Sequence, residues 1–233
     1  MLNTYQNTYD EKYFNNFTTG YSPYSDLDLK NIFKILIPKI PDASNLNICE
    51  VGCASGQFSI ELEQRLKKSE PNLYGVDIAK DILELYPFNK INASAFNIPI
   101  ENNFFDLICF QASLHHMFPF EKVVAESNRL LKNGGLFYCL EPNYFHPHRY
   151  FLMRFKYLYN LFVKINDTPI NPNKLKKCLL ANNYKILYFQ YINIFFSTDS
   201  LFQKIQNSYS KTYFANKIPK YSLPWFITIA QKS

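Results

Sequence analysis

Short apolar runs alternate with amphipathic segments between residues 26 and 141. Five runs are largely apolar and end at polar or turn-forming residues, which is typical of buried strands: NICEVG, LYGVDI, INASAF, FDLICFQAS and GLFYCLEP. Before and between them, apolar residues recur at helical spacing in DLDLKNIFKILIP, FSIELEQRLKK, AKDILELYP and EKVVAESNRLLK. The last of these helices is expected to stop at Asn133 and Gly134. Strands that alternate with helices predict a parallel sheet covered on both faces.

The rhythm changes after Glu141. A long aromatic helix is expected from about Pro147 to Lys164, and a shorter one from Asn173 to Ala181. The runs YKILYFQYINIF and PWFITIAQK then predict two strands that pair as antiparallel neighbours at a sheet edge.

Length and composition favour one soluble domain. The chain has 233 residues, of which 47% are apolar, and this suits a single large domain. Its polar N-terminus lacks the features of a secretory signal, and its apolar runs are too short to span a bilayer. Five cysteines form no CxxC pair, and an odd number suits reduced thiols better than a disulfide framework. We therefore expect a cytoplasmic protein.

Charge is distributed unevenly along the chain. Residues 1–141 hold 12 basic and 17 acidic side chains, whereas residues 142–233 hold 13 basic and 2 acidic ones. The C-terminal part is therefore expected to face an anionic substrate, nucleic acid or membrane surface, or to form a solvated lysine-rich face.

Two glycines stand close together where the first apolar run ends. Gly52 and Gly56 lie in EVGCASG between a strand and a helix, where a tight turn needs positive backbone angles. Asp77 ends the next strand, 25 residues beyond Gly52, where an acidic side chain can bind both hydroxyls of a ribose. The turn lacks GxGxxG spacing and the lysine of a P-loop, which counts against a dinucleotide or a nucleoside triphosphate.

Five blocks in order resemble the class I S-adenosylmethionine-dependent methyltransferases, small-molecule branch, between about residues 48 and 141. They are EVGCASG, GVDIA, ASAFNIPIENNFFDLI, QASLHHMFPFEKVVAESNRLLKNGG and LFYCLEPN. Two positions depart from the family pattern: Ala54 replaces the middle glycine of the turn, and Ser94 stands where an Asp commonly meets the adenine amine.

The resemblance implies an α/β, Rossmann-like fold. The expected sheet has seven strands and is mostly parallel, with helices on both faces, an antiparallel C-terminal edge strand and a helical insertion after strand five. Residues 1–233 would form one methyltransferase domain. Its expected parts are an N-terminal arm (1–25), a cofactor-binding core (26–141), a helical lid insertion (142–182) and C-terminal antiparallel strands (183–233).

The resemblance also implies how the cofactor S-adenosylmethionine, which leaves as S-adenosylhomocysteine, would bind. The methionine moiety would lie over the glycine turn, Asp77 would hold the ribose, and Gln111 would open onto the methyl group. For Phe96, which would flank the adenine, an ordinary core position is the alternative. The implied cofactor-binding residues are Glu50, Gly52, Cys53, Ala54, Gly56, Asp77, Ile78, Ser94, Ala95, Phe96 and Gln111.

Methyl transfer from a sulfonium is driven by the cofactor, so the protein aligns the acceptor and removes its proton where needed. His115 and His116 are the leading candidate bases, because imidazole titrates near neutral pH. One of them is expected to pack structurally, and a reaction without a protein base stays open. Glu141 and His146 are second candidates near the same sheet edge. His146 and His148 lack further ligands nearby, so no metal site is expected.

The predicted helix after strand five has a basic stripe on an otherwise apolar and aromatic surface. We expect it to form a lid over the acceptor pocket, with His146, Arg149 and Arg154 as candidate substrate contacts. The same helix would suit a dimer contact or peripheral binding to an anionic membrane, so both a monomer and a homodimer stay open.

The sequence therefore predicts an S-adenosylmethionine-dependent methyltransferase with a small-molecule acceptor, favouring an oxygen of a sugar, a lipid-linked precursor or a secondary metabolite. One alternative is a nucleic-acid-binding protein or RNA methyltransferase that uses the basic C-terminal half on phosphates. Another is a catalytically silent partner subunit, because a fold alone does not fix a function. The chain shows no separate RNA-binding module, so no stable nucleic-acid partner is expected.

Overall fold

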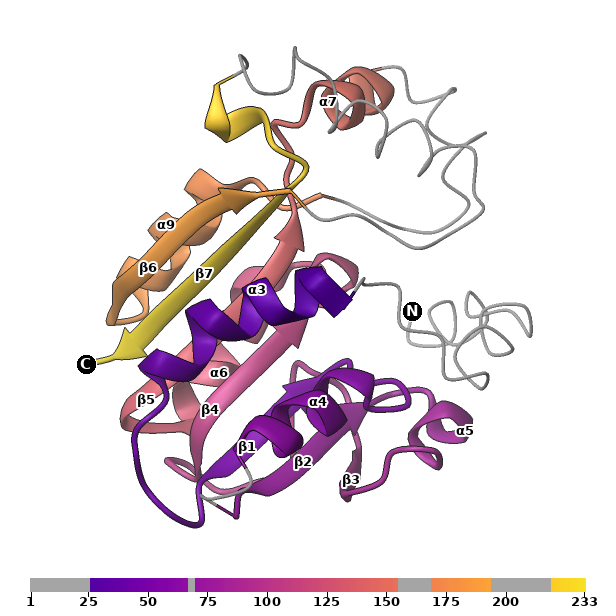
Figure 1. The fold of residues 1–233 in the computed structure, drawn as a ribbon, viewed down its shortest axis with the longest axis vertical. Coiled ribbons are helices and arrows are strands. Elements are labelled where there is room, and N and C mark those ends of the chain that lie inside the picture. The colour runs from indigo at the N-terminus through magenta and orange to yellow at the C-terminus, as the bar shows by residue number, and fades with distance from the viewer. Residues whose placement is uncertain (1–25, 67–69, 155–168, 194–218) are drawn as a thin grey trace.

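The computed structural model describes residues 26–66, 70–154, 169–193 and 219–233, and its centre is a seven-stranded sheet (Figure 1). The strands are β1 (Asn47–Val51), β2 (Asn72–Asp77), β3 (Asn89–Asn92), β4 (Phe105–Gln111), β5 (Leu131–Pro142), β6 (Tyr184–Ile192) and β7 (Trp225–Lys232). Their order is β3-β2-β1-β4-β5-β7-β6. The pairs from β3 to β5 are parallel, whereas β7 is antiparallel to both β5 and β6. The predicted fold class is confirmed, and β7 is inserted between β5 and the edge strand β6.

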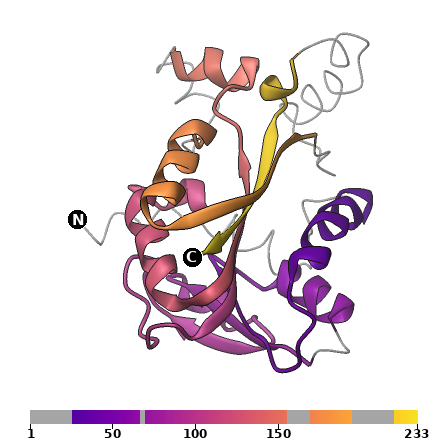
Figure 2. The ribbon, with the colours of Figure 1, turned by 90° about the vertical axis from the view of Figure 1, so that its left-hand side faces the viewer.

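Helices cover both faces of this sheet (Figure 2). The longer ones are α3 (Asp26–Leu36), α4 (Gln57–Arg65), α6 (Phe120–Leu130), α7 (Pro147–Arg154) and α9 (Pro172–Ala181). The short ones are α5 (Lys80–Leu83) and the 3-10 turns η1 (Ile37–Lys39), η3 (Leu114–His116) and η4 (Lys220–Ser222). Helices α3 and α4 lie on one face, and α6 and α9 lie on the other. Helix α7 lies beyond the carboxyl end of β5.

The sheet divides the core into two apolar layers. On the α3 and α4 side, the Phe58 ring stacks on Phe33 at 5.2 Å and on Tyr138 at 5.7 Å, measured between ring centroids. On the α6 and α9 side, Phe137 contacts Phe110 and Tyr184 at 5.2 and 5.7 Å. Strands β4 and β5 are buried along most of their length, and each fully buried large side chain contributes about 1.5–3 kcal/mol of transfer free energy.

Helix α6 ends three residues before the predicted stop at Asn133. Leu131 already pairs with Phe105 as the first residue of β5. The backbone N–H groups of Asn103 and Phe104 take the carbonyls of the last helical turn, at 3.0 and 2.8 Å. These bonds end the helix early, because the carbonyls that would extend it are already satisfied outside it.

The segment expected to form a lid divides into two parts. Helix α9 packs on β6 and α6, and its Leu175 and Leu179 belong to the core. It is therefore part of the layer that covers the sheet. Helix α7 confirms the start of the expected 147–164 helix, while residues 155–164 lie outside the described residues. A lid stays a prediction for the part before α9.

All five cysteines are free thiols. Cys49, Cys53, Cys109 and Cys139 are buried, and Cys178 is half-buried. Burial raises the thiol pKa at each of the five. In the part of the chain that the structure describes, no helix is long and apolar enough to cross a membrane.

Candidate functional site

The turn after β1 brings two glycines against the loop that follows β4. Gly52 has φ +71° and Gly56 has φ +86°, conformations that favour glycine. A Cβ atom on Gly52 would lie 2.6 Å from Ser113 Cβ and 2.9 Å from Met117 Cε. Both distances are too short for real contacts, so the turn and the β4 loop approach closely only because residue 52 is glycine. Ala54, which replaces the middle glycine of the family pattern, also has a positive φ, +46°.

Asp77 ties this turn to the end of β2. Its Oδ2 accepts the backbone N–H of Ala54 at 3.0 Å, and its Oδ1 accepts that of Ala79 at 2.9 Å. Burial raises the pKa of the carboxyl group. The N–H of Ile78 is a third backbone donor to this carboxylate, which has about four lone-pair sites, so acceptor capacity remains for a ligand hydroxyl. Asp77 therefore lies beside the glycine turn, and its role toward a ribose stays a prediction.

Glu50 lies in the interior at the end of a hydrogen-bond chain. Ser59 donates to Glu50 Oε2 through its Oγ at 2.6 Å and through its backbone N–H at 3.2 Å. Tyr86 in turn donates its hydroxyl to Ser59 Oγ at 2.8 Å. Burial is the main cause that raises the pKa of Glu50 to about 8. Sequence reasoning missed Ser59 and Tyr86, because helical and loop spacing carries no signal of this contact.

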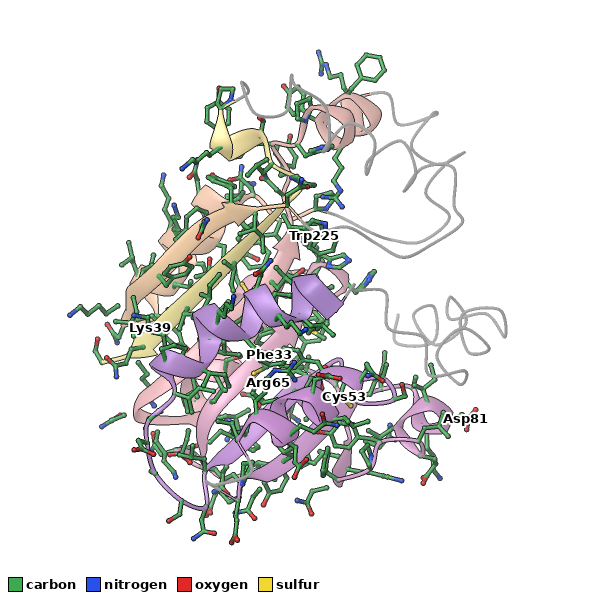
Figure 3. All side chains as sticks on the ribbon, in the orientation of Figure 1. Phe33, Lys39, Cys53, Arg65, Asp81 and Trp225 are labelled. Atoms are coloured by element: carbon green, nitrogen blue, oxygen red, sulfur yellow. The ribbon has the colours of Figure 1, made fainter. Side chains whose placement is uncertain are left out.

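The Tyr86 ring fits between two glycines. A Cβ on Gly56 would lie 2.6 Å from the ring, and one on Gly75 in β2 would lie 2.7 Å from it and from Cys53 Sγ. Figure 3 shows Cys53 in this interior region and Asp81 on the outer side of α5. Tyr86 is therefore a wedge that fixes the spacing between the turn and β2.

A second cluster forms where β4 and β5 end. Glu141 is fully buried, and its carboxylate accepts three backbone N–H groups: Ser113 at 3.2 Å, Leu114 at 2.8 Å and His115 at 3.3 Å. Its Oε2 also lies 2.6 Å from His115 Nδ1. Ser113 Oγ donates to the carbonyl of Val51 at 2.6 Å, which joins the cluster to the end of β1. The structure thus brings together two candidates that the sequence named separately, His115 and Glu141.

The other basic candidates are placed differently. The His116 ring contacts that of His115 at a centroid distance of 3.9 Å, while His146 is buried at the start of α7. Arg149 donates to the carbonyl of Pro224, and its guanidinium lies 5.2 Å from the Trp225 ring (Trp225 is labelled in Figure 3). Arg154 is exposed at the end of α7. Their substrate roles stay predictions.

The predicted adenine residues follow β2 and β3. Ile78 and Phe96 are 36% and 40% exposed, so Phe96 is not a core aromatic. Ser94 Oγ accepts the N–H of Phe96 at 3.3 Å, and Ala95 is buried. At the end of β4, Gln111 Oε1 accepts the Tyr138 hydroxyl at 2.8 Å. Its Nε2 is buried and finds no hydrogen-bond partner among the described residues.

A pocket of about 230 Å³ opens next to His115. The lining comes from four places: η3, the start of α6, the segment after β5 and the start of α9. The lining residues are Leu114, His115, Met117, Phe118, Phe120, Tyr144, Pro169, Ile170, Asn171 and Lys174. Sequence reasoning missed the part contributed by residues 169–174. Among the described residues, no cluster of three or more His, Cys, Asp and Glu side chains could hold a metal ion.

Comparison with known sequences points to one domain family. Residues 49–139 match the family described as "Methyltransferase domain". The demethylmenaquinone methyltransferase of Bacillus mycoides is 26% identical over 138 residues, which cover 54% of this chain and 56% of that protein. The chain thus spans about half the length of the curated relatives that it matches.

Comparison with solved structures covers nearly the whole chain. A SAM-dependent methyltransferase from Archaeoglobus fulgidus is similar with a TM-score of 0.64 at 16% identity, covering 96% of this chain and 100% of that one. The [4+2]-cyclase SpnF is similar with a TM-score of 0.58 at 14% identity, covering 87% and 80%. Likeness at these identities establishes the fold and leaves the reaction to the site.

Proposed function

This chain has the Rossmann-like fold of the class I S-adenosylmethionine-dependent methyltransferases, and we propose that it transfers the cofactor's methyl group to a small-molecule acceptor. The observation that carries the proposal is the bond from Asp77 to the glycine turn. It places a carboxylate with spare acceptor capacity beside a turn that only glycine can make, at the carboxyl edge where α/β sheets bind ligands.

The residues present fit the cofactor at three points. The turn from Gly52 to Gly56, which is half-buried at Gly52 and Ala54, would offer backbone groups to the methionine moiety, and Asp77 would offer an acceptor to the ribose. The orphaned Nε2 of Gln111 is a buried donor that lacks a partner among the described residues, which supports a ligand acceptor near the end of β4. When bound, S-adenosylmethionine supplies an electrophilic methyl group on its sulfonium.

We assign proton uptake from the acceptor to His115. The Glu141 carboxylate holds its Nδ1 at 2.6 Å and fixes the ring's orientation, so Nε2 is the atom assigned to exchange the proton. Glu141 is buried behind the histidine and also holds the β4 loop, which gives it a positioning role. His116, whose ring contacts that of His115 at an interplanar angle of 42°, is assigned the packing role expected for one of the pair.

The chemical class of the acceptor is a further part of the proposal. The matched curated relatives are named for demethylmenaquinone, a small molecule, which supports a small-molecule acceptor over RNA. A sugar, a lipid-linked precursor and a secondary metabolite remain acceptors to test, beside a reduced naphthoquinone. Cytoplasmic location stays a prediction.

Calorimetry with S-adenosylhomocysteine tests the cofactor assignment. Asp77→Asn should weaken binding about 10- to 100-fold, because it removes charge-assisted hydrogen bonds worth about 1.5–3 kcal/mol. The control Asp81→Asn changes an exposed acid on α5 and should bind like the wild type. Absence of binding to the folded wild-type protein would remove the cofactor and the proposed function together.

Turnover of 1,4-naphthalenediol, followed as S-adenosylhomocysteine formation, tests the base. His115→Gln should lower kcat about 10²- to 10⁴-fold with little change in cofactor affinity, whereas His116→Gln should retain most activity. Equal losses in both variants would contradict the assignment. If no small hydroxylated acceptor is methylated while RNA is, the RNA methyltransferase becomes the better interpretation.

A further inference from the structure

The pocket beside η3 shares one side chain with the cofactor turn. Met117 lines the pocket, and its Cε is among the atoms that a Cβ on Gly52 would strike. Met117 therefore borders both the pocket and the turn at Gly52. A ligand in the pocket and a ligand on the turn would both lie near this side chain.

Residues 169–171 fix the far wall of the pocket. Ile170 forms an isolated parallel bridge with Asn143: its N–H donates to the carbonyl of Pro142 at 3.1 Å, and its carbonyl accepts the N–H of Tyr144 at 3.1 Å. Asn171 then caps α9, accepting the N–H groups of Asn173 and Lys174 at 3.0 and 3.3 Å. The wall is thus built from backbone bonds that extend β5, which makes the pocket part of the fold.

The lining suits a compact apolar ligand that carries a negative charge. Seven of its ten side chains are apolar or aromatic, and the polar ones are His115, Asn171 and Lys174. None of these ten described lining residues carries a carboxylate, and Lys174 belongs to the first turn of α9, at the positive end of the helix dipole. A volume of about 230 Å³ lies below the roughly 300–1,000 Å³ typical of drug-sized ligands, so one or two rings would fill it.

We propose that this pocket binds the methyl acceptor, and that the acceptor is a compact, largely apolar anion whose charge is read by Lys174. The ligand's role as methyl acceptor rests on the proposed function, whereas its size and charge rest on the pocket alone. It assigns acceptor recognition to the start of α9, apart from the arginines of α7.

A matched pair of probes tests the charge. 2-Naphthoate and 2-naphthamide have nearly the same shape, and only the first is anionic. Naphthoate should bind the full-length protein about 2- to 5-fold more tightly at low salt, as expected for one exposed charge pair. Lys174→Met should abolish this preference, whereas Lys177→Met, an exposed lysine of the same helix outside the pocket, should keep it.

Methyl NMR locates the binding. The chain has three methionines, so ¹³Cε-methionine labelling gives few signals, and Met117→Leu assigns the one that matters. Naphthoate should shift the Met117 signal, and S-adenosylhomocysteine should shift it independently from the turn side. A Met117 signal unmoved at saturating naphthoate would overturn the proposal, as would equal binding of the two probes or equal effects of the two lysine variants.

Calorimetry with S-adenosylhomocysteine distinguishes failure of the acceptor pocket from failure of the proposed function. If that product fails to bind while naphthoate still shifts Met117, the proposed function fails and the pocket stands as an anion-selective ligand site. If the product binds and naphthoate does not, the cofactor assignment stands and the acceptor pocket lies elsewhere.

Discussion

Replacing Gly52 with alanine should destabilise the protein by about 2–5 kcal/mol. The left-handed backbone at φ +71° costs a non-glycine residue about 1–2 kcal/mol. The new Cβ would also lie 2.6 Å from Ser113 Cβ, and relieving such overpacking costs about 1–3 kcal/mol. Ser113 has little freedom to move, because its Oγ and its N–H are bonded to Val51 and Glu141.

Two substitutions divide this effect into its causes. Gly134→Ala meets the same backbone strain at φ +80°, yet the nearest atom to its Cβ is 3.9 Å away, so it should cost only about 1–2 kcal/mol. Ala54→Gly removes strain at φ +46° and adds chain entropy to the unfolded state, so it should change stability by about 0 to +1 kcal/mol.

Urea denaturation followed by the fluorescence of Trp225, the single tryptophan, measures all three free energies of unfolding. Gly52→Ala should unfold at clearly lower urea than Gly134→Ala. If the two lose the same stability, or if Gly52→Ala lies within about 0.5 kcal/mol of the wild type, the close packing of the turn against the β4 loop is refuted.

Three further predictions concern polar side chains that form hydrogen bonds within the fold. Burial raises the pKa of Glu50 from its ordinary value of 4.5 to about 8, so between these pH values the folded protein keeps a proton that the unfolded chain has lost. Stability should therefore fall as pH rises from 4.5 to 8, and Glu50→Gln should flatten the pH profile of the urea midpoint. Tyr86→Phe loses the hydrogen bond to Ser59 but keeps the wedge, so it should cost about 1 kcal/mol in thermal unfolding, against about 3–5 kcal/mol for Tyr86→Ala. Lys232 donates three hydrogen bonds of 2.8 Å, two of them to backbone carbonyls at the end of α6, and Lys232→Met removes all three. The substitution should speed amide exchange in the last turn of α6 and leave amide exchange in α3 unchanged.

The fold could be predicted from local patterns because each strand and each helix has its own pattern of apolar residues. The alternation of buried runs and amphipathic helices indicated the order of elements through β5, and the last two runs indicated an antiparallel pair. Local patterns could not indicate that β7 enters between β5 and β6, since that order depends on which edges are free after the sheet forms. The early end of α6 also depends on a distant partner, Asn103.

The site was predictable where one turn or one strand end supplies the chemistry. Gly52 and Asp77 are of this kind, and the structure brings them to the same turn. The wedge at Tyr86 and the pocket wall at Ile170 escaped the sequence reasoning because each joins segments that are far apart in the chain. Arg149, which the sequence reasoning expected to meet a substrate, donates to the Pro224 carbonyl, a partner far along the chain, and its substrate role stays a prediction.

The reactivity of the buried thiols can report how the sheet opens. Cys49, Cys109 and Cys139 lie on β1, β4 and β5, neighbouring strands at the centre of the molecule, and a thiol that is buried and protonated does not react. An alkylating reagent should therefore modify the half-buried Cys178 first and the strand thiols only when their strands separate. Mass spectrometry of each labelled peptide would then report, strand by strand and without any mutation, whether the centre of the sheet opens in one step or in several.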